Sequence, residues 1–419
     1  MKTYAMMILG CKVNDYEAHA LKEKMDKDYQ EVNFKDPADI YIIFSCCVTN
    51  VAESKTRKFI HQCKRTNPDS YVCVVGCYAQ TNNTHEVFDE VDLVIGSKHK
   101  DKIKDYIDEA LKKDMVESLK DVEFEYLSLH EYKDKTRAFL KVQDGCNQYC
   151  SYCIIPFARG HERSAKLEDL VEEAKVLAKT TKEVVLTGIH TGRYFDGKHR
   201  LIDLLRALLE VEGLETIRLS SIEITEITDE IIDLMASTDR LAHHLHIPLQ
   251  AGSNEILKAM NRPYTVEEFY ARTEYIRERI PGVSISTDLI VAFPGETEAM
   301  FEQTLDFLKK IRFNFIHVFP YSRKHGTVAD KMSGHFNNDV KKARVKAVME
   351  TEEVIAREIE DTFVGKDVKV LIERNDGKNS FGHSKEYLSV EVKGVIESNQ
   401  LIDVKIISAN KGHIIGEKK

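Results

Sequence analysis

Three cysteines near the middle of the chain are the residues best suited to carry chemistry. Cys146, Cys150 and Cys153 lie in the segment GCNQYCSYCIIPFARG with the spacing C-x3-C-x2-C. Three thiolates on one short loop can bind three irons of a cubane 4Fe–4S cluster and leave the fourth iron open. A structural zinc site needs a fourth protein ligand, and the nearest one, His161, lies beyond a proline and a glycine that should turn the loop away. Three unrelated core thiols are the remaining alternative, and the dense spacing favours the open-iron cluster.

The flanking sequence predicts a barrel that would hold this loop. From position 138, strand-like segments alternate with helix-like segments. The expected strands are 139–143, 183–187, 216–220, 244–248, 284–291 and 315–319, and the expected helices are 167–178, 201–211, 229–235, 266–279 and 300–311. Six strand–helix units suit an incomplete (β/α)6 barrel, in which chemistry takes place at the carboxyl ends of the strands. The cysteine loop directly follows the first of these strands.

The N-terminal third predicts a smaller parallel α/β domain. Its expected strands are 4–9, 40–44, 71–75 and 91–95, and its expected helices are 16–25, 51–66, 84–88 and 101–112. This alternation is typical of a parallel sheet with helices on both faces.

A cysteine follows each of the first three strands. Cys11 lies in LGCKVN, Cys46 in FSCCVTN and Cys77 in VVGCYAQ. Because the carboxyl ends of parallel strands meet at one edge of a sheet, these thiols can converge and form a second three-cysteine site. Core thiols at strand ends are the alternative. Cys63, inside a helix, and Cys73, inside a strand, are interpreted as packing residues.

The composition is that of a globular protein with two or three domains, since the chain has 419 residues, 42% of them hydrophobic. Nine cysteines grouped in motifs are typical of metal binding in a reducing compartment. No apolar stretch can cross a bilayer, so we expect a cytoplasmic protein with no membrane partner. The net charge of −9 does not by itself predict RNA binding, which needs a local basic patch.

One helix provides such a patch. The segment 51–66 carries six basic side chains with no acid between them: Lys55, Arg57, Lys58, His61, Lys64 and Arg65. A solvated helix face explains such a pattern as well as phosphate contacts do, and both interpretations stay open.

The C-terminal end predicts a third domain. A long helix over 339–360 is followed by short β-like segments at 368–372, 387–392, 394–397 and 401–407. These favour a small antiparallel barrel.

The cysteine loop resembles that of radical S-adenosylmethionine (SAM) enzymes, and with GCKVN, SCCVTN and GCYAQ it resembles the methylthiotransferase branch of that superfamily. The last domain is similar to the TRAM domain, an OB-like RNA-binding module. The resemblance covers nearly the whole chain and implies an N-terminal methylthiotransferase domain at 1–116, a radical SAM domain at 132–356 and a TRAM domain at 360–419. The chain departs from the family pattern at Val328, at Ala165 and at Phe44-Ser45 before Cys46.

The resemblance implies two 4Fe–4S clusters and two roles for SAM, as methyl donor and as radical source. Cys146, Cys150 and Cys153 would bind the cluster that holds SAM, and Cys11, Cys46 and Cys77 an auxiliary cluster. Matching C-x-V-T places Cys46, rather than Cys47, at the ligand position. The expected SAM contacts are an aromatic beside the cluster and polar or glycine positions at strand ends: Tyr152, Gly188, Ser220, Gln250 and Asp288.

The motifs look most like the branch that modifies threonylcarbamoyladenosine in tRNA, at ring carbon 2 of the adenosine at position 37, beside the anticodon. The other branches modify isopentenyladenosine in tRNA or an aspartate of a ribosomal protein. We expect a monomer that binds the anticodon stem-loop and needs an external electron donor and a sulfur source. The expected substrate contacts are basic: Arg159, Arg163, Lys55 and Arg57. Phe381, His383, Tyr387 and Lys411 are either RNA contacts or core or solvated residues of the last domain.

Two rival functions remain open: a radical SAM enzyme of different chemistry with structural N-terminal thiols, and a non-catalytic iron–sulfur RNA-binding protein. Anaerobic reconstitution should load about eight irons per chain if there are two clusters and about four if there is one. Cleavage of SAM that depends on dithionite is expected of the enzyme. Its absence in the reconstituted protein would leave the binding protein as the explanation.

Overall fold

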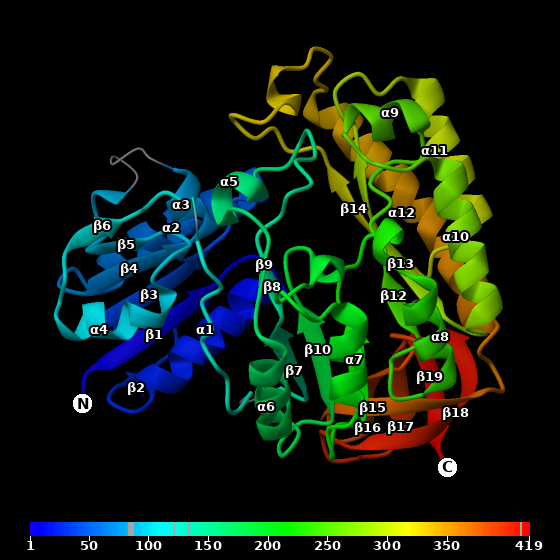
Figure 1. Ribbon diagram of the computed structural model, residues 1–419, viewed down its shortest axis with the longest axis horizontal. Helices are drawn as coiled ribbons and strands as arrows, with labels where there is room; N and C mark the ends of the chain where they lie inside the picture. Colours follow the sequence, from blue (N-terminus) through cyan, green and yellow to red (C-terminus); the bar gives the residue numbers. More distant parts are fainter. Residues whose placement is uncertain (83–87, 121, 133–134, 411–412) are drawn as a thin grey trace.

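The computed structural model describes residues 1–82, 88–120, 122–132, 135–410 and 413–419. Figure 1 shows an N-terminal domain beside a central barrel, with a small C-terminal barrel at the foot of the central one. Within these residues, none of the helices combines the length and the apolar character needed to span a bilayer.

The N-terminal domain is a six-stranded parallel sheet in the order β2-β1-β3-β4-β5-β6. The strands are β1 Thr3–Ile8, β2 Gln30–Glu31, β3 Ile40–Ser45, β4 Tyr71–Gly76, β5 Leu93–Ile95 and β6 Lys113–Met115. All six positions of β3 are buried, as a continuous apolar run at the centre of a parallel sheet predicts. The very short β2 and β6 were not expected from the sequence, because neither has a strand-like pattern.

Helices cover both faces of this sheet, as predicted. The helices α1 Lys12–Met25 and α4 Ile103–Asp108 pack on one face, and α2 Asn50–Thr66 and α3 Cys77–Thr81 pack on the other. Cys63 and Cys73 lie one in each of these two cores and are fully buried, which confirms their packing role. The helix expected at 84–88 falls almost entirely outside the described residues.

The central domain contains the six predicted parallel strands. They are β7 Arg137–Lys141, β10 Glu183–Thr187, β11 Thr216–Leu219, β12 His244–His246, β13 Ser284–Val291 and β14 Phe315–Pro320. Two three-stranded sheets, β7-β10-β11 and β12-β13-β14, are joined by the bridges Ile217–Leu241 and Ser221–His246. Among the described strands no pairing joins β14 to β7, so the barrel is incomplete, as expected.

The outer layer of the barrel is helical. Its helices are α6 Leu167–Leu177, α7 Leu201–Leu209, α8 Asp229–Ser237, α10 Val266–Arg279 and α11 Glu298–Ile311. The short α5 Ile155–Arg159 and α9 Asn254–Ala259 were not expected, nor was the small hairpin of β8 Gln143–Asp144 and β9 Arg163–Ser164. These three elements lie in or beside the cysteine loop, where the sequence has no clear periodicity.

The C-terminal domain follows the long α12 Asn338–Asp361 and is a closed five-stranded barrel. Its strands are β15 Asp367–Asn375, β16 Asn379–Ser384, β17 Ser389–Lys393, β18 Leu401–Asn410 and β19 His413–Lys418, in the order β15-β16-β17-β19-β18. All pairs are antiparallel except β17–β19. The predicted strand at 394–397 is wrong, because Gly394 has a φ of +92° and ends the preceding strand in a turn.

The C-terminal barrel closes the amino-terminal end of the central barrel. Arg218 of β11 forms an ion pair with Glu183 at 2.7 Å and donates to the carbonyl oxygens of Ser384 and Lys385 at 3.2 and 3.1 Å. Tyr387 follows in the same loop and stacks on His244, with ring centroids 4.8 Å apart. Tyr387 therefore belongs to the floor of the barrel rather than to an outer RNA surface. Lys411 lies outside the described residues.

A buried carboxyl joins the N-terminal domain to the barrel and makes the interface sensitive to pH. The Tyr16 hydroxyl on α1 donates to Glu173 Oε1 on α6 at 2.9 Å. Burial raises the pKa of Glu173 from 4.5 to about 7. Because this carboxyl binds its proton more tightly in the folded chain, its contribution to stability is present below about pH 4.5 and is lost as the pH rises towards about 7.

Glu173→Gln should abolish the loss of stability that the buried carboxyl causes as the pH rises. Relative to the original chain, the variant should gain about 3 kcal/mol of unfolding free energy between about pH 4 and about pH 8. Chemical unfolding at several pH values measures this difference. Glu172→Gln, at a neighbouring position with a 72% exposed side chain, is the control and should show no such change. A pH-independent difference for Glu173→Gln would contradict the assignment.

Candidate active site

One cavity brings together residues of all three domains. It has a volume of about 750 Å³ and is lined by Cys11 of the N-terminal domain, by Cys146, Cys150 and Cys153 of the barrel, and by Tyr387 of the C-terminal domain. Four polar or glycine positions of the barrel also line it: Gly188, Ser220 and Gln250, which follow β10, β11 and β12, and Asp288, which lies within β13. Residues that the sequence placed at separate strand ends therefore converge on one space.

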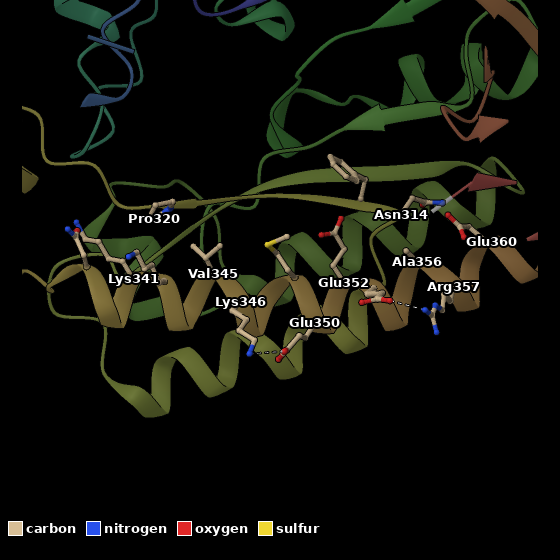
Figure 2. A pocket seen from close by; sticks show the side chains of 15 residues that line it. Asn314, Pro320, Lys341, Val345, Lys346, Glu350, Glu352, Ala356, Arg357 and Glu360 are labelled. Carbon is tan, nitrogen blue, oxygen red and sulfur yellow. Dashed lines mark hydrogen bonds and ion pairs between the residues drawn. The ribbon is translucent and has the colours of Figure 1, made fainter. Parts of the chain in front are cut away.

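Tyr152 lies between this cavity and a smaller one of about 230 Å³, which Gln250 and Asp288 also line. An aromatic ring at this junction suits a flat heterocycle beside the cysteine loop. A larger groove of about 910 Å³ runs between α12 and β14 (Figure 2). No cysteine is among the described residues that line this groove, so the chemistry is located in the cavity and not there.

The cysteine loop is held at its base and at its tip. The β8–β9 hairpin joins the two ends of the loop, and the Cys146 amide donates to the Gly160 carbonyl at 3.1 Å. Gly145 has a φ of +74°, and a Cβ there would lie 2.0 Å from the His161 carbonyl oxygen, so only glycine fits. Farther along, the Ser151 hydroxyl donates to the Ala259 carbonyl at 2.7 Å. The three thiols therefore project from a loop of defined shape.

The donor set of the loop suits a metal cluster. Burial raises the pKa of Cys150, and it raises that of Cys153 to about 12. Buried thiols become thiolates when a metal cation compensates their charge, and thiolates bound to separate irons of a cubane need not converge on one point. Arg262 donates to Cys150 Sγ at 3.3 Å and is itself bound by Glu223. The residues present therefore fit a 4Fe–4S cluster held by three cysteines.

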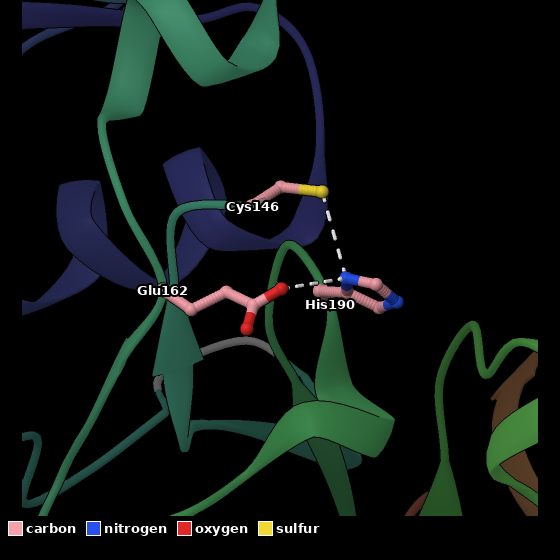
Figure 3. A group of neighbouring side chains, drawn as sticks. All are labelled: Cys146, Glu162 and His190. Carbon is pink, nitrogen blue, oxygen red and sulfur yellow. Dashed lines mark hydrogen bonds and ion pairs between the residues drawn. The ribbon is translucent and has the colours of Figure 1, made fainter. Parts of the chain in front are cut away.

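Figure 3 shows Cys146, Glu162 and His190, whose donor atoms lie close enough together for a single metal ion. His190 Nδ1 lies 3.5 Å from Cys146 Sγ and 3.2 Å from Glu162 Oε1, and its Nε2 lies 2.8 Å from Glu226 Oε1. Against the effect of burial, these three partners raise the pKa of His190 to about 12. Both ring nitrogens of His190 thus have partners within the chain, and Nδ1 lies within hydrogen-bond distance of Cys146 Sγ. His161, the histidine nearest in sequence, is bound to Asn147 at 2.9 Å instead.

The N-terminal thiols converge as predicted. Ser45 pairs with Gly76 across β3 and β4, and Ile8 pairs with Phe44 across β1 and β3, so the three cysteines leave neighbouring strands at one edge. A Cβ on Gly10 would lie 2.9 Å from the Cβ of Cys46, which shows how closely the Cys11 loop approaches. Burial raises the pKa of Cys46 to about 12.

Cys77 is the most strongly activated of these thiols. A hydrogen bond from Cys47, followed by the charges of Arg159 and Lys100, outweighs burial and lowers the pKa of Cys77 to about 6. Cys47 itself is fully buried among core residues. Both adjacent thiols, Cys46 and Cys47, thus lie near Cys77.

Arg159 does not have the place expected of a substrate contact. Its side chain is fully buried. Its Nε donates to Cys77 Sγ at 3.2 Å, Nη1 to Glu17 and Asp144 at 3.1 Å each, and Nη2 to Asn14 at 2.7 Å and Glu17 at 3.4 Å. These bonds occupy all five N–H donors of the guanidinium. The prediction that Arg159 binds the substrate is therefore corrected: Arg159 ties the loop of one cysteine set to a thiol of the other.

Further charges complete this buried network. Lys100 and Lys141 each lie 2.7 Å from a Glu17 oxygen, and Lys141 and Arg163 lie 2.9 and 3.1 Å from Asp144. Arg163 also donates to the Arg159 carbonyl at 2.7 Å, so it too is engaged within the chain rather than free for a substrate. Four cations face two carboxylates, which leaves positive charge beside the thiols.

Helix α2 begins beside the smaller cavity, whose lining includes Thr49 directly before the helix. Its first residues contact the loop after β14: Lys324 Nζ lies 2.7 Å from Glu53, and the Asn50 amide donates to the Ser322 hydroxyl at 3.2 Å. Lys55 is exposed and has no ion-pair partner among the described residues. Arg57 is exposed and donates to the Tyr78 hydroxyl at 2.8 Å.

Sequence reasoning missed several residues of the site. Glu17 and Asn14 lie on α1 and bind Arg159, and Arg262 and His190 contact the cysteines. Some signal was present, since Asn14 belongs to the GCKVN motif and Arg262 ends the segment HIPLQAGSNEILKAMNR. Their partners lie tens to more than a hundred residues away, so the motif alone does not reveal the contacts.

A three-thiol loop after the first strand of an incomplete parallel barrel defines the radical SAM class of enzymes. Residues 140–308 match the profile of the Radical SAM superfamily, and residues 3–96 match the Uncharacterized protein family UPF0004. The cobalamin-dependent S-adenosylmethionine radical enzyme OxsB shares the fold, with a TM-score of 0.51 at 13% identity over 84% of this chain and 56% of that one.

Curated relatives match almost the full length. A threonylcarbamoyladenosine tRNA methylthiotransferase MtaB of Bacillus subtilis is 38% identical over 99% of this chain and 97% of its own. The MtaB of Aquifex aeolicus is also 38% identical, over 96% and 99%. A tRNA-2-methylthio-N(6)-dimethylallyladenosine synthase of Acetivibrio thermocellus is 35% identical over 89% and 81%. The chain belongs to the radical SAM methylthiotransferase family.

Proposed function

We propose that this protein adds a methylthio group to ring carbon 2 of N6-threonylcarbamoyladenosine at position 37 of tRNA. The observation that carries the proposal is the single cavity that Cys11 of one thiol set shares with all three cysteines of the other. Full-length similarity to two MtaB enzymes at 38% identity, against 35% over a smaller share for the dimethylallyladenosine synthase, supports the choice of branch.

Each part of the cavity has a role in this reaction. A reduced 4Fe–4S cluster with bound SAM would supply the radical chemistry that an unactivated ring carbon requires and that no side-chain base can provide. Cys146, Cys150 and Cys153 hold this cluster, and Arg262 and His190 orient two of the thiolates. Tyr152, Gly188, Ser220, Gln250 and Asp288 line the space for SAM. Tyr387 lines the floor of the same space.

The second thiol set would hold an auxiliary 4Fe–4S cluster, which would supply the site for the sulfur to be inserted. Cys11, Cys46 and Cys77 are its ligands, and Arg159 fixes Cys77 while Gly10 lets the Cys11 loop approach Cys46. SAM would be needed in two roles, as methyl donor and as radical source. The reaction consumes electrons and sulfur, so an external electron donor and a sulfur source are partners.

The RNA partner is the anticodon stem-loop, whose unpaired adenosine can be turned out of the loop into the cavity. Lys55 and Arg57, with Lys58 and Arg65 on the same helix, are exposed and suit phosphate contacts. Tight phosphate contacts would explain how a chain of net charge −9 binds RNA. The protein acts in the cytoplasm as a monomer.

The adjacent thiols offer a test of the auxiliary site. Cys46→Ala should lower the iron content of the reconstituted chain from about eight to about four, because it removes a ligand. Cys47→Ala is the matched control and should keep about eight. Iron analysis and electron paramagnetic resonance of both variants measure this. Equal loss in the two variants, or the reverse order, would contradict the assignment of Cys46.

Loss of the gene should have a specific effect on tRNA. We expect the methylthio form of threonylcarbamoyladenosine to disappear from digested tRNA and its precursor to accumulate. Mass spectrometry of tRNA nucleosides measures both, and reintroduction of the original chain, but not of Cys150→Ala, should restore the product. Disappearance of methylthio-isopentenyladenosine instead would move the protein to the other tRNA branch.

A further inference from the structure

Lys12 stands apart from the other lysine and arginine side chains that line the cavity. Each of the other three has an acidic partner: Arg137 lies 3.1 Å from Glu373, Arg218 lies 2.7 Å from Glu183, and Arg262 is bound by Glu223. Among the described residues, no carboxylate lies within ion-pair distance of Lys12, although its side chain is exposed to the cavity. The cavity therefore contains one unpaired ammonium group.

The position of Lys12 directs this group towards the reaction centre. Lys12 is the first residue of α1 and directly follows Cys11, and the cysteines of the other set line the same cavity. Arg137, Arg218 and Asp288 of the central barrel and Tyr387 of the C-terminal domain line the same cavity. Asp288 is itself held by His246, with Nε2 and Oδ1 3.3 Å apart.

An unpaired cation near other cations is costly unless an anionic ligand compensates it. The neighbouring arginines repel Lys12, and their own acids do not reach it. A single carboxylate entering the cavity would form a charge-assisted hydrogen bond with this ammonium. The geometry is therefore that of a site for one negative charge beside the auxiliary thiols.

We propose that Lys12 binds the carboxylate of the threonylcarbamoyl group and thereby selects this substrate over an adenosine with an uncharged dimethylallyl group. The inference rests on the proposed function and adds to it the residue that recognises the N6 substituent of the adenosine. The threonyl part ends in a carboxylate, whereas the dimethylallyl group is a hydrocarbon and would leave the ammonium unpaired. A site built for a charged partner discriminates strongly against a ligand that lacks it. The carboxylate of SAM is the second source of the same chemistry.

Three RNA stem-loops separate these sources. They carry threonylcarbamoyladenosine, its methyl ester, or dimethylallyladenosine, and they are assayed for affinity and for turnover with the reconstituted enzyme. Lys12→Met should lower both the affinity for the acid RNA and kcat/KM on it by about ten- to a hundredfold. On the methyl ester RNA, the affinities and the kcat/KM values of the variant and the original chain should differ by less than about twofold, because the ester lacks the negative charge that Lys12 binds.

Lys55→Met is the matched control, because this exposed lysine lies outside the cavity lining. As a phosphate contact it should weaken acid and ester RNAs by the same factor. Lys12→Gln is prepared in parallel, and both Lys12 variants are checked for iron content and for their absorption spectrum before use. If Lys12→Met does not assemble its clusters, the glutamine variant supplies the comparison.

An equal loss of affinity and turnover on the acid and ester RNAs would overturn the proposal and assign Lys12 to the SAM carboxylate. Unchanged affinity and turnover on the acid RNA would overturn it as well. Failure of the proposed function is a different result, because the original chain would then be inactive on the threonylcarbamoyl RNA before any variant is compared.

Discussion

The buried guanidinium of Arg159 is the contact on which the geometry of the active site depends. It follows Cys153 by six residues, donates to Cys77 of the other cysteine set, and is neutralised by Glu17 and Asp144 from two domains. Removing one partner from such a network would leave an uncompensated buried charge, which costs several kcal/mol, on the order of 3–5. The network therefore holds the two cysteine loops in one relative position, and the cavity between them has a defined width.

The cavity is formed by residues of all three domains. The N-terminal domain supplies Cys11 and Lys12, the barrel supplies the cysteine loop and the polar strand ends, and the C-terminal domain supplies Tyr387. Arg218 ties the last domain to the barrel through Glu183 and two backbone carbonyls. The C-terminal barrel is therefore part of the enclosure of the site and not only an appended module. A radical reaction benefits from such an enclosure because water and stray donors are kept out.

The elements of the fold were largely predictable because their patterns are local. The six barrel strands and the strands β1, β3, β4 and β5 follow apolar runs of strand length, and α10 was expected with its observed bounds, Val266–Arg279. The strands that were not predicted have local causes too. β16 has the polar, glycine-containing sequence NSFGHS, and β2 and β6 are only two and three residues long. At 394–397 the sequence looked like a strand, but Gly394 ends β17 with a positive φ.

By itself, the sequence determined which thiols are available and at which strand ends they lie, because spacing within a motif and alternation along the chain are properties of neighbouring residues. Only the tertiary structure decided what surrounds them. It placed His190 rather than His161 beside Cys146, buried Arg159 against Cys77, and left Lys12 with no carboxylate of the described residues within ion-pair distance. These outcomes depend on side chains that are distant in sequence and on which charges are desolvated together, and no local pattern encodes either.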